Sequence, residues 1–357
     1  MTVNRNRLKQ LTGLMAEQQW DVLILYGHTW RKDFFRCLVN VNLSGPHAAA
    51  IVDRSGEVRV VVSDPWDFEA LSDGDHAAFA PDFGAGLKRF ANRRAKIAIA
   101  GMELMQARFV EALGSPVSAT SFVEEIRRVK SPEELASIRK AAELSDLGYK
   151  RFVEAAQPGM TEYELVAEVE SFLKSRGSED NFMLIGSGGT EVTGMKPPTE
   201  RKLQPGDSVT TELTPQVNGY WAQICRTLVI GEPSPKQLES FMIFFEAQKA
   251  AEELLKPGVN IADVARVQND VFRKYGYGDY TGPKYTRVRG HNLGLHPDEN
   301  PYVLEDVNYI VKDGMVVIAH PNTYLPLSGY MVFGDTLLVT AIGCVALNST
   351  ERKLFRK

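Results

Sequence analysis

The segment from Asp207 to Ile230 reads DSVTTELTPQVNGYWAQICRTLVI. It places Asn218-Gly219 between two strand-like runs, and this dipeptide is the strongest short-range signal for a two-residue hairpin turn. The segment therefore predicts an antiparallel hairpin.

The turn also fixes the expected register of this hairpin. If Val217 pairs with Tyr220, then Glu212 lies opposite Cys225, and period-two alternation puts both side chains on one face of the sheet. Gln223 becomes a diagonal neighbour of Glu212, within reach of a shared ligand. The alternative is a set of polar side chains on a solvated face.

Helical patterns precede and follow the hairpin. Ser131-Pro132 has the form of an N-cap followed by proline at the first helical position, and Thr161 with Glu164 has the form of a capping box. Two further helices are expected near Pro235–Leu255 and Ile261–Tyr275. We therefore expect an α+β domain over residues 121–357.

Upstream, short apolar runs such as DVLILYG, VRVVVSD and KIAIAG alternate with helical stretches. This alternation is typical of an α/β domain, which we place at residues 1–120. Two domains also suit a chain of 357 residues, because single cores rarely grow to that size.

The composition excludes several classes of function. The net charge is −4, and no long basic run is available to follow a phosphate backbone, so nucleic acid is not an expected partner. No segment has the apolar length of a membrane span or the form of a signal peptide. Three dispersed cysteines favour a reducing compartment, and we expect a cytoplasmic protein.

Several motifs in series resemble the pita-bread superfamily, which includes creatinase, Xaa-Pro aminopeptidase and methionine aminopeptidase. The motifs are PEELASIRKAAELSD, PGMTEYELVAEVE, PTERKLQPGDSV, NGYWAQICRT, GHNLGLH, DGMVVIAHPNTY and GDTLLVT. The resemblance covers roughly Ser121 to Thr340, and the N-terminal domain in outline. It implies a C-terminal pita-bread fold with an N-terminal α/β domain like that of creatinase.

The metallopeptidases of this superfamily bind two divalent ions through two Asp, one His and two Glu. In the same order, the corresponding positions of this chain hold Glu212, Gln223, His291, His320 and Gly334. One carboxylate cannot balance the charge of two divalent ions, so the resemblance implies no dinuclear centre here. We expect no metal and no cofactor.

The leading functional hypothesis is a metal-independent, creatinase-like enzyme. It would cleave a C–N bond, by hydrolysis or elimination, in a small nitrogen-containing substrate that carries a carboxylate. The expected catalytic residues are His291, His320 and Glu212, because histidine is the simplest proton carrier near neutral pH and a carboxylate can raise its basicity. Cys225 could instead be a reactive thiolate or an inert buried side chain.

Two alternatives remain open. The chain could be a mononuclear metal-dependent enzyme in which Glu212, His291 and His320 form a set of two histidines and one carboxylate. It could also be a non-catalytic pseudo-peptidase that binds a peptide or protein in the cleft.

Further residues are expected to contact a small-molecule substrate: Gln223, Cys225, His296, Asp298, Glu299, Tyr220, Tyr330, Lys196 and Arg31. Arg31 belongs to the segment HTWRKDFFR in the N-terminal domain. In the creatinase branch this domain covers the site of the other subunit, so we expect a homodimer of that kind. Arg226 is expected to pair with a buried acid.

Overall fold

The chain forms two compact units, Met1–Arg127 and Arg128–Lys357. The computed structural model describes residues 3–71, 76–91 and 95–357. The sequence placed the boundary at residue 120, at the beginning of α6 (Thr120–Arg128). This helix lies largely within the first unit, where the Arg127 guanidinium pairs with the Asp33 carboxylate at 2.8 Å.

The first unit contains a six-stranded mixed sheet in the order β4-β3-β2-β1-β5-β6. Its strands are β1 Val22–Gly27, β2 Ala48–Asp53, β3 Val58–Val62, β4 Ala77–Phe79, β5 Ile97–Ala100 and β6 Val117–Ser118. Besides α6, its helices are α1 Arg5–Gln18, α2 Asp33–Leu38, α3 Pro65–Leu71, α4 Phe83–Phe90, η2 Met102–Leu104 and α5 Ala107–Ala112. Residues of α4 and α5 form one hydrophobic core with β1, β2, β3 and β5.

The second unit is built on a large sheet with the main order β12-β11-β13-β16-β10-β8-β7. β9, β17 and β18 pair with strands of this path from the side, and β14 and β15 form a separate pair. The strands of the unit are β7 Asn181–Gly188, β8 Ser208–Val217, β9 Tyr220–Trp221, β10 Ile224–Val229, β11 Gly290–Asn292, β12 Glu299–Tyr302, β13 Val316–Ala319, β14 Asn322–Leu325, β15 Gly329–Val332, β16 Gly334–Thr340, β17 Gly343–Ala346 and β18 Phe355–Arg356. The helices are α7 Pro132–Ala155, α8 Glu162–Lys174, α9 Pro235–Leu254, α10 Ile261–Lys274 and η3 Gly278–Thr281. This mixture of helices and a largely antiparallel sheet confirms the α+β prediction.

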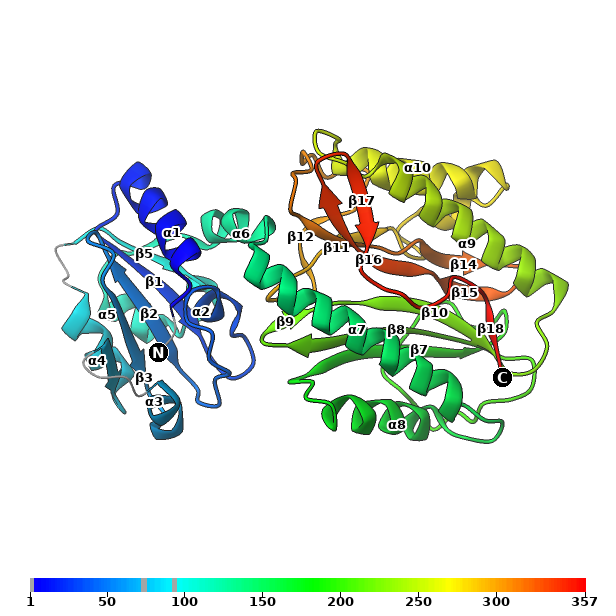
Figure 1. The fold of residues 1–357 in the computed structure, drawn as a ribbon, viewed down its shortest axis with the longest axis horizontal. Helices are drawn as coiled ribbons and strands as arrows, with labels where there is room; N and C mark the ends of the chain where they lie inside the picture. The colour runs from blue at the N-terminus through cyan, green and yellow to red at the C-terminus, as the bar shows by residue number, and fades with distance from the viewer. Residues whose placement is uncertain (1–2, 72–75, 92–94) are drawn as a thin grey trace. The chain divides into compact units, whose positions relative to one another are not determined.

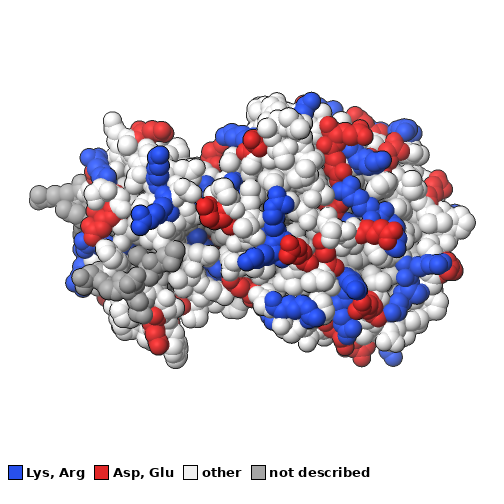
Figure 2. Space-filling view, viewed as in Figure 1, with Lys and Arg blue, Asp and Glu red and all other residues white. Residues whose placement is uncertain are grey.

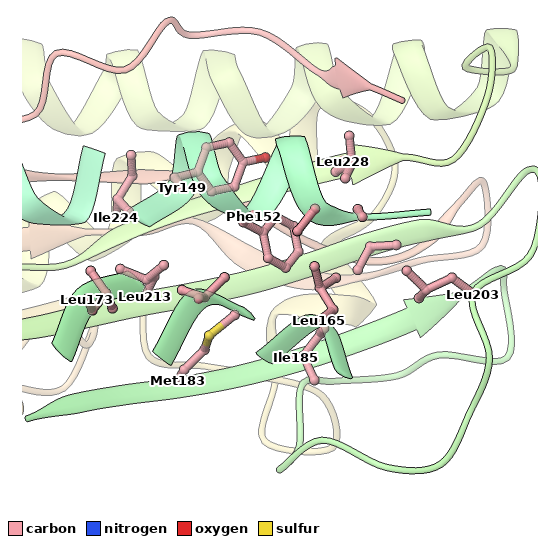
Figure 3. Packing of buried hydrophobic residues seen from close by; sticks show 14 of the residues in the cluster. Tyr149, Phe152, Leu165, Leu173, Met183, Ile185, Leu203, Leu213, Ile224 and Leu228 are labelled. Carbon is pink, nitrogen blue, oxygen red and sulfur yellow. The ribbon is translucent and has the colours of Figure 1, made fainter. Parts of the chain in front are cut away.

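Two pairs of helices cover this unit, and Figure 1 shows α7 and α8 over the green half and α9 and α10 over the other. On the first half, Tyr149 and Phe152 of α7 and Leu165 of α8 pack against Leu213 of β8 and Ile224 of β10 (Figure 3). These side chains are almost entirely removed from water, which supplies the main force that holds the helices on the sheet.

The helix starts expected from the sequence are confirmed. Ser131 and Thr161 accept hydrogen bonds from the backbone of Glu134 and Glu164, and both glutamates reach back to complete capping boxes. Each cap contributes about 0.5–2 kcal/mol. The strong caps explain why these boundaries were readable from local sequence.

The hairpin also forms in the expected register. Asn218 and Gly219 both adopt left-handed backbone, with φ of 50° and 81°, as a two-residue primed turn requires. Val217 pairs with Tyr220, and Glu212 therefore lies opposite Cys225. The turn thus carries Glu212 into the middle of the sheet with a defined orientation.

Basic and acidic side chains are interspersed on the face shown in Figure 2. Within the described ranges, every helix is too short or too polar to cross a lipid bilayer. The three cysteines are all free thiols.

Candidate functional site

A row of aligned residues crosses three neighbouring strands of the second unit. Glu212 of β8 lies opposite Cys225 of β10, which in turn lies opposite Gly334 of β16. Directly paired residues of an antiparallel sheet project to the same face. The three positions therefore share one face of the sheet.

The row continues into two histidines. Ala319 of β13 pairs with Asp335, so His320 follows at the level of Gly334, and a Cβ atom built on Gly334 would be 2.6 Å from Cβ of His320. His291 of β11 pairs with Ile318. The two imidazole rings meet edge to face, with centroids 5.3 Å apart. The structure thus brings the two histidines nominated as catalytic into contact, whereas Glu212 lies on the same face with β10 and β16 between its strand and β13.

Glu212 is held by a neighbouring amide. Nε2 of Gln223 donates to Oε2 of Glu212 at 3.2 Å and also lies 3.3 Å from Sγ of Cys225. Burial, together with the negative charge of Asp298, raises the pKa of Glu212 to about 7. Burial and Glu212 also raise the pKa of the Cys225 thiol well above its ordinary value, so this cysteine is a neutral side chain and not a thiolate.

The two histidines are neutral in this environment. Burial lowers the pKa of His291 and lowers that of His320 to about 3, helped at His320 by His291 and Arg289. Nδ1 of His291 donates to the carbonyl of Asn292 at 3.0 Å, which leaves Nε2 with its lone pair. In the described part of the chain, neither ring nitrogen of His320 has a hydrogen-bond partner.

Burial therefore works against the expectation that a histidine carries the proton near neutral pH, and the catalytic roles of His291 and His320 stay a prediction. The carboxyl of Glu212 is the group whose pKa lies near neutrality. Glu212 was also expected to pair with a histidine, but among the described residues its hydrogen-bond partner is Gln223. Burial explains both pKa shifts, because it favours the uncharged form of an imidazole and the uncharged form of a carboxyl.

Three predicted substrate contacts follow β11: His296 and Asp298 lie in the loop, and Glu299 begins β12. Asp298 is half exposed, and its carboxylate is 3.6 Å from Nδ1 of His291, so it faces the site. Glu299 instead pairs with buried Lys130 at 3.1 Å and accepts from Asn292 at 3.0 Å. Nδ1 of His296 contacts the backbone of Asp298. Glu299 therefore anchors this loop to the segment before α7 through its carboxylate, and its contact with a substrate stays a prediction.

The remaining candidates are dispersed. Tyr330 is buried beside Glu212 and Cys225, and burial raises the pKa of its phenol, so it is a neutral wall of the site. Tyr220 is not a wall, because it is buried and its hydroxyl donates to Glu134 at 3.0 Å. Lys196 is exposed, in a segment joined to Ile185 of β7. Arg31 lies in the first unit and contacts Asp33 at 3.1 Å.

Sequence reasoning missed Lys130 and Thr336. Thr336 accepts from the backbone N–H of Gln223 at 2.9 Å and donates to its carbonyl at 2.8 Å, so it fixes the strand that carries the amide. Its place in the quoted motif GDTLLVT was a usable signal. Lys130 offered none, because its partner Glu299 is 169 positions away.

The donors do not fit a pair of metal ions. Position 223 supplies an amide, and position 334 has no side chain and no room for one, since an added Cβ would be 2.5 Å from the carbonyl oxygen of Ala319. Glu212, His291 and His320 are suitable donors for one transition-metal ion, and the unpartnered nitrogens of His320 are consistent with such a role. Across the described ranges, however, no three acidic, imidazole or thiol groups stand close enough to hold an ion without movement.

The crowding at position 334 gives a direct prediction. Gly334→Ala is expected to destabilise the fold by about 1–3 kcal/mol, because the new methyl group overlaps backbone that cannot move freely. Gly343→Ala is the matched control, since open space surrounds that glycine on the adjoining strand. Urea denaturation of both variants measures the difference. Equal midpoints would show that the sheet accommodates a side chain at 334.

Comparison with known proteins defines the class of this molecule. The sequence pattern of metallopeptidase family M24 matches residues 136–341, more than half of the chain. A Xaa-Pro dipeptidase of Pyrococcus furiosus is 33% identical over 65% of this chain and 66% of its own length, and one of Pyrococcus horikoshii is 31% identical over 69% and 71%. This chain therefore belongs to metallopeptidase family M24, a family of hydrolases.

Solved structures agree with this assignment. The prolidase of Pyrococcus horikoshii OT3 superimposes with a TM-score of 0.85 at 24% identity, covering 98% of this chain and 99% of that one. The prolidase of Pyrococcus furiosus gives 0.82 at 26% identity, covering 95% and 99%. The pita-bread fold with its N-terminal domain, predicted from the motifs, is confirmed.

These comparisons overturn the leading functional hypothesis. The relatives are Xaa-Pro dipeptidases and prolidases, and the matched family is one of metallopeptidases, whereas a metal-independent, creatinase-like C–N cleaving enzyme had been expected. The error came from treating the replaced ligands as evidence for a change of class. Ligand replacement limits the number of ions, but the class follows from the similarity of the whole domain.

Proposed function

We propose that this chain is a peptidase of short peptides that works with a single metal ion. The observation that carries the proposal is the contact between His291 and His320 on the face of the sheet that also carries Glu212. Among the described residues, neither imidazole nitrogen of His320 has a hydrogen-bond partner. One carboxylate and two neutral imidazoles match the ligand set of a single transition-metal ion. Closing around an ion would require these side chains to move toward one another.

Such an ion would supply Lewis-acid polarisation of a peptide carbonyl and a bound water of lowered pKa. The chain's own residues have separate tasks. Gln223 holds Oε2 of Glu212 through its amide. The Asn292 carbonyl holds Nδ1 of His291, which leaves the lone pair of Nε2 as the one that could bind an ion. Asp298 places a negative charge beside His291, where it can attract the ammonium group of a peptide.

A second candidate function is the binding of short peptides without hydrolysis. A specific observation favours it: Glu212, with a pKa of about 7, is largely neutral below that pH and offers little negative charge to a cation. The hydrogen bond from Gln223 further engages the same carboxyl group.

One experiment separates the two functions. The purified protein is loaded with Mn²⁺, Co²⁺ or Zn²⁺, or treated with EDTA, and is then given Ala-Pro, Leu-Pro and Ala-Ala while free amino acids are measured. Metal-dependent release of amino acids supports the peptidase. Calorimetric binding of a dipeptide without release under any condition supports the binding protein, and the absence of both rejects both.

We further propose a homodimer in which the N-terminal unit of one copy covers the site of the other. Trp30, beside Arg31, is 86% exposed, and Trp66 is 72% exposed, so this unit presents apolar surface suited to contact. Light scattering that gives a monomer mass would reject the dimer.

The three free thiols support a reducing, cytoplasmic location.

A further inference from the structure

A separate pocket of about 430 Å³ opens on the first unit, between α4, α5 and the segment before β2. Its volume lies in the range of small-molecule sites. It shares no residue with the site built around Glu212. The lining includes three aromatic side chains, His47, Phe83 and Phe109, and two basic ones, Lys88 and Arg108.

Three rings form an aromatic wall. The imidazole of His47 lies 4.9 Å from the ring of Phe109 and 5.3 Å from that of Phe83, and the two phenylalanine rings are 5.2 Å apart. Both phenylalanines are buried, so the wall is fixed by packing. The half-buried imidazole of His47 is the ring of this wall that offers a planar ligand a contact surface.

A hydrogen bond also fixes the orientation of His47. The Tyr26 hydroxyl lies 2.8 Å from Nδ1 of His47, and the two rings stack at 6.2 Å. Burial raises the pKa of Tyr26 to about 12, so the phenol keeps its proton. Burial and Arg108 lower the pKa of His47, which makes this ring a neutral surface. The wall is therefore pre-formed and uncharged.

Two cations stand at the pocket, and neither has a counter-ion among the described residues. Lys88 of α4 and Arg108 of α5 are exposed, and neither forms an ion pair with any residue that the structure describes. The guanidinium of Arg108 lies 4.7 Å over the ring of Phe109, so it sits at the edge of the wall. The acid of the lining, Asp82, is committed to capping α4 through the N–H of Ala85 at 3.0 Å. The net charge of the side chains that line the pocket is therefore positive.

We propose that this pocket binds a small planar aromatic molecule that carries an anionic group. The ring of the ligand packs against the imidazole of His47, which Phe83 and Phe109 hold in place, and its anionic group lies between Lys88 and Arg108. A carboxylate and a phosphate both satisfy the two cations, since each accepts hydrogen bonds from a guanidinium and an ammonium. Neither half of such a ligand suffices, because exposed cations alone hold an anion weakly in water.

Isothermal titration calorimetry tests the site with defined probes. Indole-3-acetate supplies an aromatic carboxylate and adenosine monophosphate an aromatic phosphate, while adenosine and inorganic phosphate supply the halves. At least one aromatic anion is expected to bind, and the halves at least about tenfold more weakly, because each lacks one set of contacts. The stronger of the two anions identifies the acidic group. Failure of both aromatic anions to bind overturns the proposal.

Variants place the binding in this pocket. The double variant Lys88→Ala/Arg108→Ala is expected to lose at least about tenfold in affinity, since both charge-assisted contacts disappear. Its fold should persist, because both side chains are exposed. Arg89→Ala is the matched control: Arg89 is also an exposed cation of α4, but it lies over Phe90 outside the pocket. Unchanged affinity in the double variant, or an equal loss in Arg89→Ala, contradicts the assignment.

Discussion

Asp335→Ala is expected to cost about 3–5 kcal/mol of the free energy of unfolding, the usual result of removing one member of a buried ion pair. Asp335 and Arg226 are both almost completely buried, and their charged atoms lie 2.6 Å apart. The second oxygen of Asp335 is 2.9 Å from the guanidinium of Arg352. Without Asp335, Arg226 keeps its charge inside the core, packed over the ring of Phe333 at 4.3 Å.

Urea denaturation followed by tryptophan fluorescence measures this loss. Asp306→Ala is the matched control, because Asp306 pairs with Arg287 at the exposed surface and exposed pairs contribute little. The double variant Arg226→Met/Asp335→Leu removes both buried charges and should recover part of the loss. A single variant as stable as the parent would show that this pair does not hold β10 to β16. The pairing itself confirms the prediction that Arg226 meets a buried acid.

Glu212→Gln is expected to lower kcat/KM for a hydrolysed dipeptide by about 100-fold or more. The substitution keeps the size of the side chain and removes the carboxylate that the proposed function requires for a ligand or a proton acceptor. The fold should tolerate the substitution, because the new side-chain oxygen can still accept the hydrogen bond that Nε2 of Gln223 donates to Glu212. Steady-state kinetics on the parent's best dipeptide provides the measurement.

Glu239→Gln serves as the control, since Glu239 is an exposed residue of α9 outside the site. Full activity in Glu212→Gln would remove this residue from the mechanism. If instead the parent binds dipeptides without hydrolysing them, the affinity of Glu212→Gln reports on the second candidate function.

Local sequence was sufficient for much of the fold around the site. The Asn218-Gly219 turn fixed the hairpin register, and this register correctly placed Glu212 opposite Cys225. The capping residue Ser131 likewise marked the beginning of α7. These features depend on neighbours in the sequence, so a single chain reveals them.

The chemistry of the site could not be predicted in the same way. The pKa values of Glu212 and His320 depend on burial and on Asp298, His291 and Arg289, which other strands and loops bring close. The lack of space at Gly334 depends on backbone from β13. Sequence patterns indicate which residues converge, but they do not report how completely the surrounding segments exclude water.

The central claim is that this member of a metallopeptidase family has room and charge for no more than one catalytic ion. Elemental analysis by mass spectrometry tests it most directly, after the protein has been loaded with excess Zn²⁺, Mn²⁺ or Co²⁺ and desalted. We expect no more than one equivalent of metal per chain, and a smaller amount in a His291→Ala variant. Two equivalents that are lost together in that variant would contradict the account.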